Sequence, residues 1–593
     1  MIETIYKKII KFLDSNQISL LVFFSSIFIL ISFSGTRLFF SDEGIILDQF
    51  YNLIHGSLAL KFAKINTASG ILTLVGSNLY GMFSYSLLIL SLPIYYLLSF
   101  IDSIFGAHLF ILHIWAFSGG AIVYLLLKNR NSGYAPLFGI ISYILLISVN
   151  MFYLKPIFFP KWGELLSIEF TNILISSFFV IVVFELFRRF FNQRIGIFAA
   201  VFILIATPIS FYAITLKHHS LTLLLTLLAF YFYYRYTEKN ENKFLYLAYI
   251  FTGLCIWTRT LDGIILLSSL LIMDILFFRR SIKHIISITA VILISLLPFF
   301  GFNYMILGNP FSIIESQPLT DKQITLVSSK YMISLDETSP KVKQMELLGK
   351  LGYIWTARIK GDYSEIVGYT LFFRLINTFG IFLVSPFLII AIAFIIERLR
   401  GKIRLNAIDK FFIIYFIVFF GIYGILYKFF NQNYLMHLLT DTPMVLEYRY
   451  LLIFYVILLY FSLRIQKINL LIHDNYKKIA FMYSIIFILT IVFFITEFPI
   501  PFLNIYYGAS WITLFLLLIL VSASILTQNR KIYIQYINNI LLVFISIALA
   551  EASIMLLFYY WAVSITYISP EQNFLIIPMM QNLIDWMYKI LIY

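Results

Sequence analysis

The sequence predicts an all-α polytopic membrane protein, a bundle of about fifteen transmembrane helices. Of its 593 residues, 61% are hydrophobic and 12% are charged, about half the charged fraction of an average soluble domain. Apolar runs of about 20 residues, long enough to span a bilayer, recur along the whole chain. In lipid such runs are stable as helices, because a helix satisfies its own backbone hydrogen bonds.

Each expected span is bounded by polar or charged residues. The first follows Lys7, Lys8 and Lys11 and approaches full span length, which is typical of a signal anchor rather than a cleaved signal peptide. The spans are centred near 17–35, 107–127, 134–154, 165–187, 195–214, 218–235, 243–257, 260–278, 284–304, 375–396, 408–428, 446–463, 478–496, 509–527 and 537–562.

The net charge of +14 comes from the loops between these spans, so it does not indicate a nucleic-acid partner. With the N-terminus in the cytoplasm and the C-terminus outside, every second loop carries a basic cluster, as the positive-inside rule requires for a protein of the cell membrane. The clusters are Lys128 and Arg130; Arg188, Arg189 and Arg194; Arg235, Lys239 and Lys243; Arg279, Arg280 and Lys283; Arg398, Arg400, Lys402 and Arg404; Arg464, Lys467, Lys477 and Lys478; Arg530 and Lys531.

The apolar segment 80–100 is ambiguous, and the charge of the loops decides its placement. Counting it as a crossing would move every later basic cluster to the outside. We therefore expect an interfacial or partly sunk helix, broken at Pro93, because proline removes a backbone donor and clashes with the preceding turn. Two long segments, 36–106 and 305–370, then lie outside, and connections of that length usually have a role beyond linking spans.

An acidic pair, Asp42 and Glu43, stands where the chain leaves the first span. Residues 43–55 have the period of an amphipathic helix that ends at Gly56. Asp42 can cap this helix, and Glu43 suits its positive end. A carboxylate beside low-dielectric surroundings can instead accept a proton from a hydroxyl nucleophile. The residues alone leave both roles open. The apolar face of the helix comprises Ile46, Phe50, Leu53 and Ile54.

Several short motifs, taken in order, resemble the GT-C class of membrane glycosyltransferases, in particular the protein O-mannosyltransferases and the lipid A aminoarabinose transferases. An Asp-Glu pair at the start of a surface helix in the first outer loop is similar to the motif of that class. The resemblance covers about residues 1–465, which we expect to form a GT-C-like catalytic module, with 466–593 as additional C-terminal transmembrane helices. The other motifs are GMFSYSLLILSLPIYYLLSF (81–100), GLCIWTRTLDG (253–263), FNYMILGNPF (302–311), FFRLINTFGIFLVSPFLII (372–390) and EYRYLLIFY (447–455).

This resemblance implies an enzyme that takes a hexosyl or pentosyl group from a polyprenyl-phosphate carrier and passes it, with inversion, to an acceptor hydroxyl at the extracytoplasmic face. It implies that Asp42 is the general base and Glu43 a helper, although the sequence does not decide which acid does the work. It points to Arg259, and more weakly to Arg449, as cations for the leaving phosphate. An interfacial arginine that reaches for water is the alternative reading of Arg259.

Three further residues are candidates for the wall of the same cavity: His218, in the segment LKHHSL, and Lys161 and Glu164, in PKWGE. Adjacent His218 and His219 do not share a helical face, so metal binding by this pair is not expected. The sequence contains no glycine-rich phosphate loop and no metal-ligand spacing. We expect no nucleotide donor, no cofactor and no metal, although some GT-C enzymes do use a divalent metal.

Two other functions share parts of this pattern. A lipid-linked sugar transporter or flippase usually has internal repeats and polar residues within its spans, whereas here the polarity gathers in the outer loops. A polysaccharide polymerase also uses lipid-linked substrates and a long outer loop, but its arginine-rich outer motif is not evident. Neither the sugar nor the acceptor, whether lipid, glycan or protein, follows from the sequence.

Overall fold

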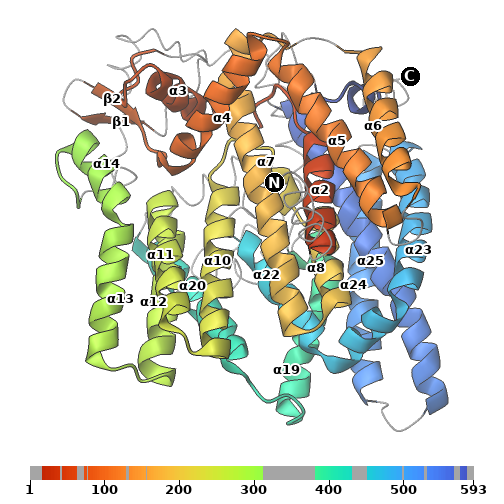
Figure 1. Ribbon diagram of the computed structural model, residues 1–593. Helices are drawn as coiled ribbons and strands as arrows, with labels where there is room; N and C mark the ends of the chain where they lie inside the picture. The colour runs from red at the N-terminus through yellow and green to blue at the C-terminus, as the bar shows by residue number, and fades with distance from the viewer. Residues whose placement is uncertain are drawn as a thin grey trace.

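The computed structural model describes residues 16–39, 43–62, 72–75, 78–128, 133–154, 157–311, 381–429, 451–496, 500–526, 531–566 and 575–583. The protein is a bundle of helices with one two-stranded hairpin in this part of the chain (Figure 1). Six of the described helices are long and apolar enough to cross a membrane, and the bent pair α13–α14 adds a seventh when counted as one span. The all-α membrane fold is confirmed, and the number of about fifteen spans stays a prediction.

The elements follow the predicted order. The helices of the bundle are α2 (Gln17–Ser32), α5 (Ala107–Lys128), α6 (Ala135–Met151), α7 (Phe159–Phe190), α8 (Gln193–Ile205), α10 (His219–Lys239), α11 (Asn242–Thr258), α12 (Thr260–Ile272), α13 (Ile282–Ser295), α14 (Leu297–Leu307), α19 (Ala391–Leu399), α20 (Ala407–Phe429), α22 (Leu452–Arg464), α23 (Gln466–Thr496), α24 (Ile500–Leu526) and α25 (Lys531–Thr566). Shorter elements are α3 (Glu43–Ile54), β1 (Leu72–Val75), β2 (Asn78–Gly81), α4 (Ser86–Asp102), α9 (Ile209–Tyr212), η1 (Met273–Phe277), α18 (Ile381–Val384) and η5 (Pro386–Ile390).

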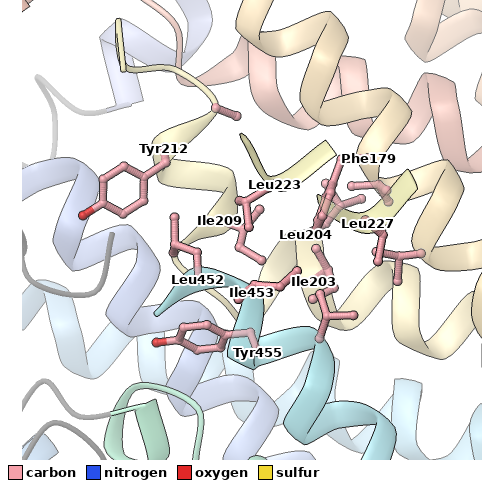
Figure 2. Packing of buried hydrophobic residues seen from close by; sticks show 14 of the residues in the cluster. Phe179, Ile203, Leu204, Ile209, Tyr212, Leu223, Leu227, Leu452, Ile453 and Tyr455 are labelled. Atoms are coloured by element: carbon pink, nitrogen blue, oxygen red, sulfur yellow. The ribbon is translucent and has the colours of Figure 1, made fainter. Parts of the chain in front are cut away.

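Apolar side chains from α7, α8, α9, α10 and α22 meet in one buried core (Figure 2). Phe179, Ile203 and Leu227 are almost fully enclosed there, together with Tyr455 from the later helix α22. Helices α23 and α25 also pack against α8. Residues after 465 are therefore packed onto the earlier helices, while the predicted division of the chain into two modules stays a prediction.

Several of the predicted basic clusters meet at one end of the bundle, which we call the basic end. Arg189 forms an ion pair with Glu238, and Arg194 donates to the backbone carbonyl of His473 at 3.3 Å. Arg464 likewise reaches the carbonyl of Arg404 at 3.4 Å. These contacts join loops far apart in the sequence, and the corresponding helix ends lie at the bottom of Figure 1.

Residues 33–39, 43–62, 78–106, 213–219 and 257–262 form the opposite end, which we call the site end (Figure 1). Helix α4 belongs to it, because Ser84 just before the helix contacts Trp257 and Ala107 just after it begins α5. The expected break at Pro93 is wrong, since α4 continues through that residue. Its packing along α7 offsets the one hydrogen bond that proline removes.

Helix α3 begins and ends close to its predicted limits, and Gly56 follows it with a positive φ of 76°. Ile46 and Phe50 are fully buried within the protein, so this part of the apolar face of α3 meets protein rather than lipid. The side-chain oxygen of Asn52 accepts the backbone N–H groups of Lys61 and Phe62 at 2.9 and 3.2 Å. Helix α3 is therefore buried on one side, while Leu53 and Ile54 near its end are half-buried.

Candidate active site

Glu43, the second acid of the predicted pair, is fully buried in the first turn of α3. Its Oε2 accepts the backbone N–H of Phe39 at 2.6 Å, and its Oε1 accepts the backbone N–H of Leu216 at 2.9 Å. Hydrogen bonds to an ionised carboxylate are stronger than those between neutral groups. Glu43 therefore ties the chain before α3 to the connection between α9 and α10. Asp42 lies outside the described residues.

The connection between α9 and α10 is held from a second side by α7. The amide of Asn172 donates to the backbone carbonyls of Thr215 and Lys217 at 2.7 and 3.0 Å. Three residues with basic side chains, Lys217, His218 and His219, follow at consecutive positions, and all three are buried. This rigid connection fixes the direction in which each of them leaves the backbone.

His218 is held by the segment that joins β2 to α4. Its Nε2–H donates to the backbone carbonyl of Ser84 at 2.6 Å, and its ring stacks on Phe83. Burial lowers the pKa of His218 to about 4, and the nearby charges of Lys217 and Arg259 act in the same direction. The imidazole is therefore neutral at pH 7. Lys217 lies against the same phenyl ring, its Nζ 5.2 Å from the centroid.

Arg259 occupies the break between α11 and α12, where the backbone is extended. Its Nη1 donates to Nδ1 of His219 at 2.6 Å, and its Nε lies 3.1 Å from Oδ2 of Asp262. The side chain is 20% exposed. Arg259 therefore faces the 213–219 connection and does not simply extend into water. Gly263 permits the tight turn, because a Cβ there would lie 2.3 Å from the backbone nitrogen of Ile256.

Two further hydrogen bonds join the β2–α4 segment to the α11–α12 turn and to α3. Ser84 donates through Oγ to the carbonyl of Trp257 at 2.7 Å, which links the β2–α4 segment to the α11–α12 turn. Gln49 of α3 donates to the carbonyl of Phe83 at 3.0 Å. The described contacts thus bring Glu43, His218 and Arg259, which are distant in sequence, into one network at the site end.

Sequence reasoning missed Glu169, which lies in the first half of α7 and is 2% exposed. Its Oε1 accepts the backbone N–H of Gly35 at 3.1 Å, and it is close enough to Arg37 and Glu43 for their charges to act on it. An acid inside an apolar run is a signal for a functional or positioning group. That signal was present in the predicted span 165–187.

The remaining predicted residues have different surroundings. Lys161 is exposed, with Nζ 5.4 Å from the ring of Trp162, and Glu164 is buried near Tyr95 of α4. Arg449 lies outside the described residues. Within the described ranges, no group of three or more His, Cys, Asp or Glu side chains is arranged to hold a metal ion, and metal independence stays a prediction.

The part of the chain that carries this network resembles a known family. Residues 162–303 match the model of the dolichyl-phosphate-mannose-protein mannosyltransferases. The matched segment runs from α7 to α14 and includes Lys217, His218 and Arg259. The family is of the GT-C type, so the predicted resemblance is confirmed and indicates a multi-pass membrane glycosyltransferase. No curated protein and no solved structure shows significant similarity to the chain.

Proposed function

We propose that the protein transfers a sugar, with inversion, from a polyprenyl-phosphate carrier to an acceptor hydroxyl at the extracytoplasmic face of the cell membrane. The observation that carries this proposal is the network in which Glu43 is joined through the 213–219 connection to Arg259. It lies within and beside the family match, whose description names a dolichyl-phosphate-linked mannose donor and a protein acceptor. Mannose on a polyprenyl phosphate is therefore the first donor to test.

Asp42 is the general base in this proposal. The acceptor oxygen attacks the anomeric carbon while its proton passes to the Asp42 carboxylate. The bond between that carbon and the phosphate oxygen breaks, and its electron pair leaves with the polyprenyl phosphate. Both oxygens of Glu43 accept backbone N–H groups, so Glu43 suits positioning better than proton transfer. A base in this position typically contributes about 10²–10⁴-fold to the rate.

The leaving phosphate needs positive charge, and the same network supplies it. The Arg259 guanidinium can bind phosphate oxygens with a fixed fork of donors, and Lys217 adds a point charge one residue before His218. His218 is neutral and donates to Ser84, so it shapes the site without adding charge. Fixed donors of this kind stabilise the charge that develops on a leaving group.

The arrangement of charge along the bundle supports the orientation. Basic residues at or just after the ends of α7, α19 and α22 lie at the end opposite the network, and cytoplasmic loops of membrane proteins are rich in Lys and Arg. The site end then faces outward. A carrier lipid reaches such a site from the membrane, while the acceptor arrives from water.

The direct experiment incubates the purified protein in nanodiscs with polyprenyl-phosphate mannose and follows the donor by mass spectrometry. A transferase releases polyprenyl phosphate when an acceptor peptide or glycan is added. A flippase leaves the donor chemically intact in every arm, and that result would reject the proposed function. A polymerase instead gives a ladder of products that lengthens with time.

A further inference from the structure

The segment after the last long helix returns to the site end. Leu575 pairs with Gly35 in an antiparallel β-bridge, and the N–H of Ile576 donates to the carbonyl of Ser34 at 2.9 Å. Ile576 and Ile577 are buried, with 2% and 0% of their surface exposed. Gly35 and Leu575, which are 540 positions apart in the sequence, are therefore neighbours in the fold.

Two helices of the bundle hold this segment in place. Nε2–H of His108, at the start of α5, donates to the carbonyl of Ile576 at 2.7 Å. The N–H of Met579 donates to the side-chain oxygen of Asn150, near the end of α6, at 2.9 Å. Both anchors are buried, and buried polar groups are costly to leave without partners.

The partner of this segment is the stretch 34–39, which leads directly to the acid pair. The backbone N–H of Gly35 donates a hydrogen bond to Glu169 on α7, and the backbone N–H of Phe39 donates one to Glu43. The C-terminal segment also holds this stretch, through the β-bridge at Gly35 and the hydrogen bond to the carbonyl of Ser34. The stretch is thus held by α7, by α3 and by the end of the chain.

We propose that residues 575–581 are a clamp that positions the stretch 34–39 and, through it, the acids of the active site. His108 and Ile576 are positioning residues of this clamp. The clamp lies beyond residues 162–303, so it adds to what the family match covers. Its effect on turnover rests on the proposed function, whereas its effect on the stretch 34–39 does not.

The clamp should affect turnover more than donor binding. Its described contacts run to Ser34 and Gly35, which precede the acid pair, and to His108 and Asn150, which anchor it. Misplacing a catalytic group by about 1 Å can cost about 10²-fold in rate. We therefore expect kcat to fall by about 10-fold or more in a chain that ends at Phe574. The KM for donor should change much less.

The decisive readout is thiol labelling of Thr36→Cys in a Cys255→Ser background, because Thr36 is 1% exposed and Cys255 is the only cysteine. We expect protection in the full chain and in a control that lacks only residues 584–593, and labelling in the chain that ends at Phe574. Equal protection in all three would overturn the clamp. If labelling changes as expected but no chain transfers sugar, the clamp stands and the proposed function fails.

A point variant covers the case in which the truncated chain does not fold. His108→Ala removes the donor to Ile576 while keeping the segment, and His108→Gln replaces it with an amide donor. We expect faster labelling of Thr36→Cys and a lower kcat in the alanine variant, with both restored toward the parent by glutamine. If alanine and glutamine behave alike, His108 has no positioning role and the clamp proposal is rejected.

Discussion

Glu43 and Leu216 are 173 positions apart in the sequence, and the carboxylate of one accepts the backbone N–H of the other at 2.9 Å. This contact fixes the start of α3 against the connection that carries Lys217, His218 and His219. Through His219 the connection reaches Arg259. A single buried carboxylate therefore links the acidic motif to the basic residues that the proposed reaction uses.

Glu43→Gln should lower stability and turnover together. The amide keeps one acceptor oxygen but turns an NH₂ group toward one of the two backbone N–H donors, so one buried donor is left without a partner. We expect a loss of about 1–3 kcal/mol in the free energy of unfolding. Thermal unfolding in detergent and kcat measured on the same preparation test this. If the variant is as stable as the parent, the Glu43 carboxylate has no structural role.

Arg259→Lys should weaken donor binding more than it disturbs the fold. The guanidinium of Arg259 contacts both His219 and Asp262 and has further donors for a phosphate. A lysine ammonium cannot reproduce this planar fork of donors. A lost charged hydrogen bond of about 1.5–3 kcal/mol corresponds to roughly 10–100-fold in the KM for donor. Arg279→Lys, the same change at an exposed position of the basic end, is the matched control and should leave KM unchanged. Equal effects in the two variants would contradict the assignment of Arg259.

His218 predicts a dependence of stability on pH. Its pKa of about 4 lies below the ordinary value of 6.5, so the unfolded chain takes up the proton first as the pH falls. Stability is therefore present above pH 6.5 and is lost toward pH 4, by up to about 1.4 kcal/mol per pH unit. His218→Gln keeps a donor for Ser84 but does not titrate. Its unfolding temperature should fall less than that of the parent between pH 7 and 5, and parallel curves would exclude this contribution.

The orientation predicts which thiols can be labelled from outside intact cells. Lys61 at the site end and Lys239 at the basic end are both exposed. In the Cys255→Ser background, Lys61→Cys should react with a membrane-impermeant maleimide, and Lys239→Cys should react only after the cells are permeabilised. The reverse pattern would place the network in the cytoplasm and reject the proposed orientation.

Local features were predictable from the sequence, and long-range ones were not. The limits of α3 and its stop at Gly56 follow from hydrophobic period and glycine geometry, both of which are properties of a few neighbouring residues. The period of α3 could not tell whether Ile46 and Phe50 meet lipid or protein, because either environment favours an apolar face. Pro93 suggested a break, but packing against α7, which no local pattern encodes, keeps α4 continuous.

The site shows the same division. Arg259 and His218 could be proposed from short motifs, yet the hydrogen bonds that join them to Glu43 run through Leu216 and His219, whose backbone and ring leave no signature in the sequence. The bridge between Gly35 and Leu575 could not be predicted from the sequence, because backbone pairing across 540 positions depends on the whole fold. Glu169 is the exception, since an acid within an apolar span can be recognised directly.

Asp42→Asn tests the central claim most directly, because asparagine caps a helix about as well as aspartate but cannot accept the acceptor's proton. The measurement is the rate at which polyprenyl-phosphate mannose is consumed in the presence of acceptor, compared with the parent at equal thermal stability. The proposed mechanism predicts normal folding and donor binding with a loss of about 10²–10⁴-fold in kcat. Parental turnover in Asp42→Asn would contradict it, and would leave Asp42 with no more than a capping role.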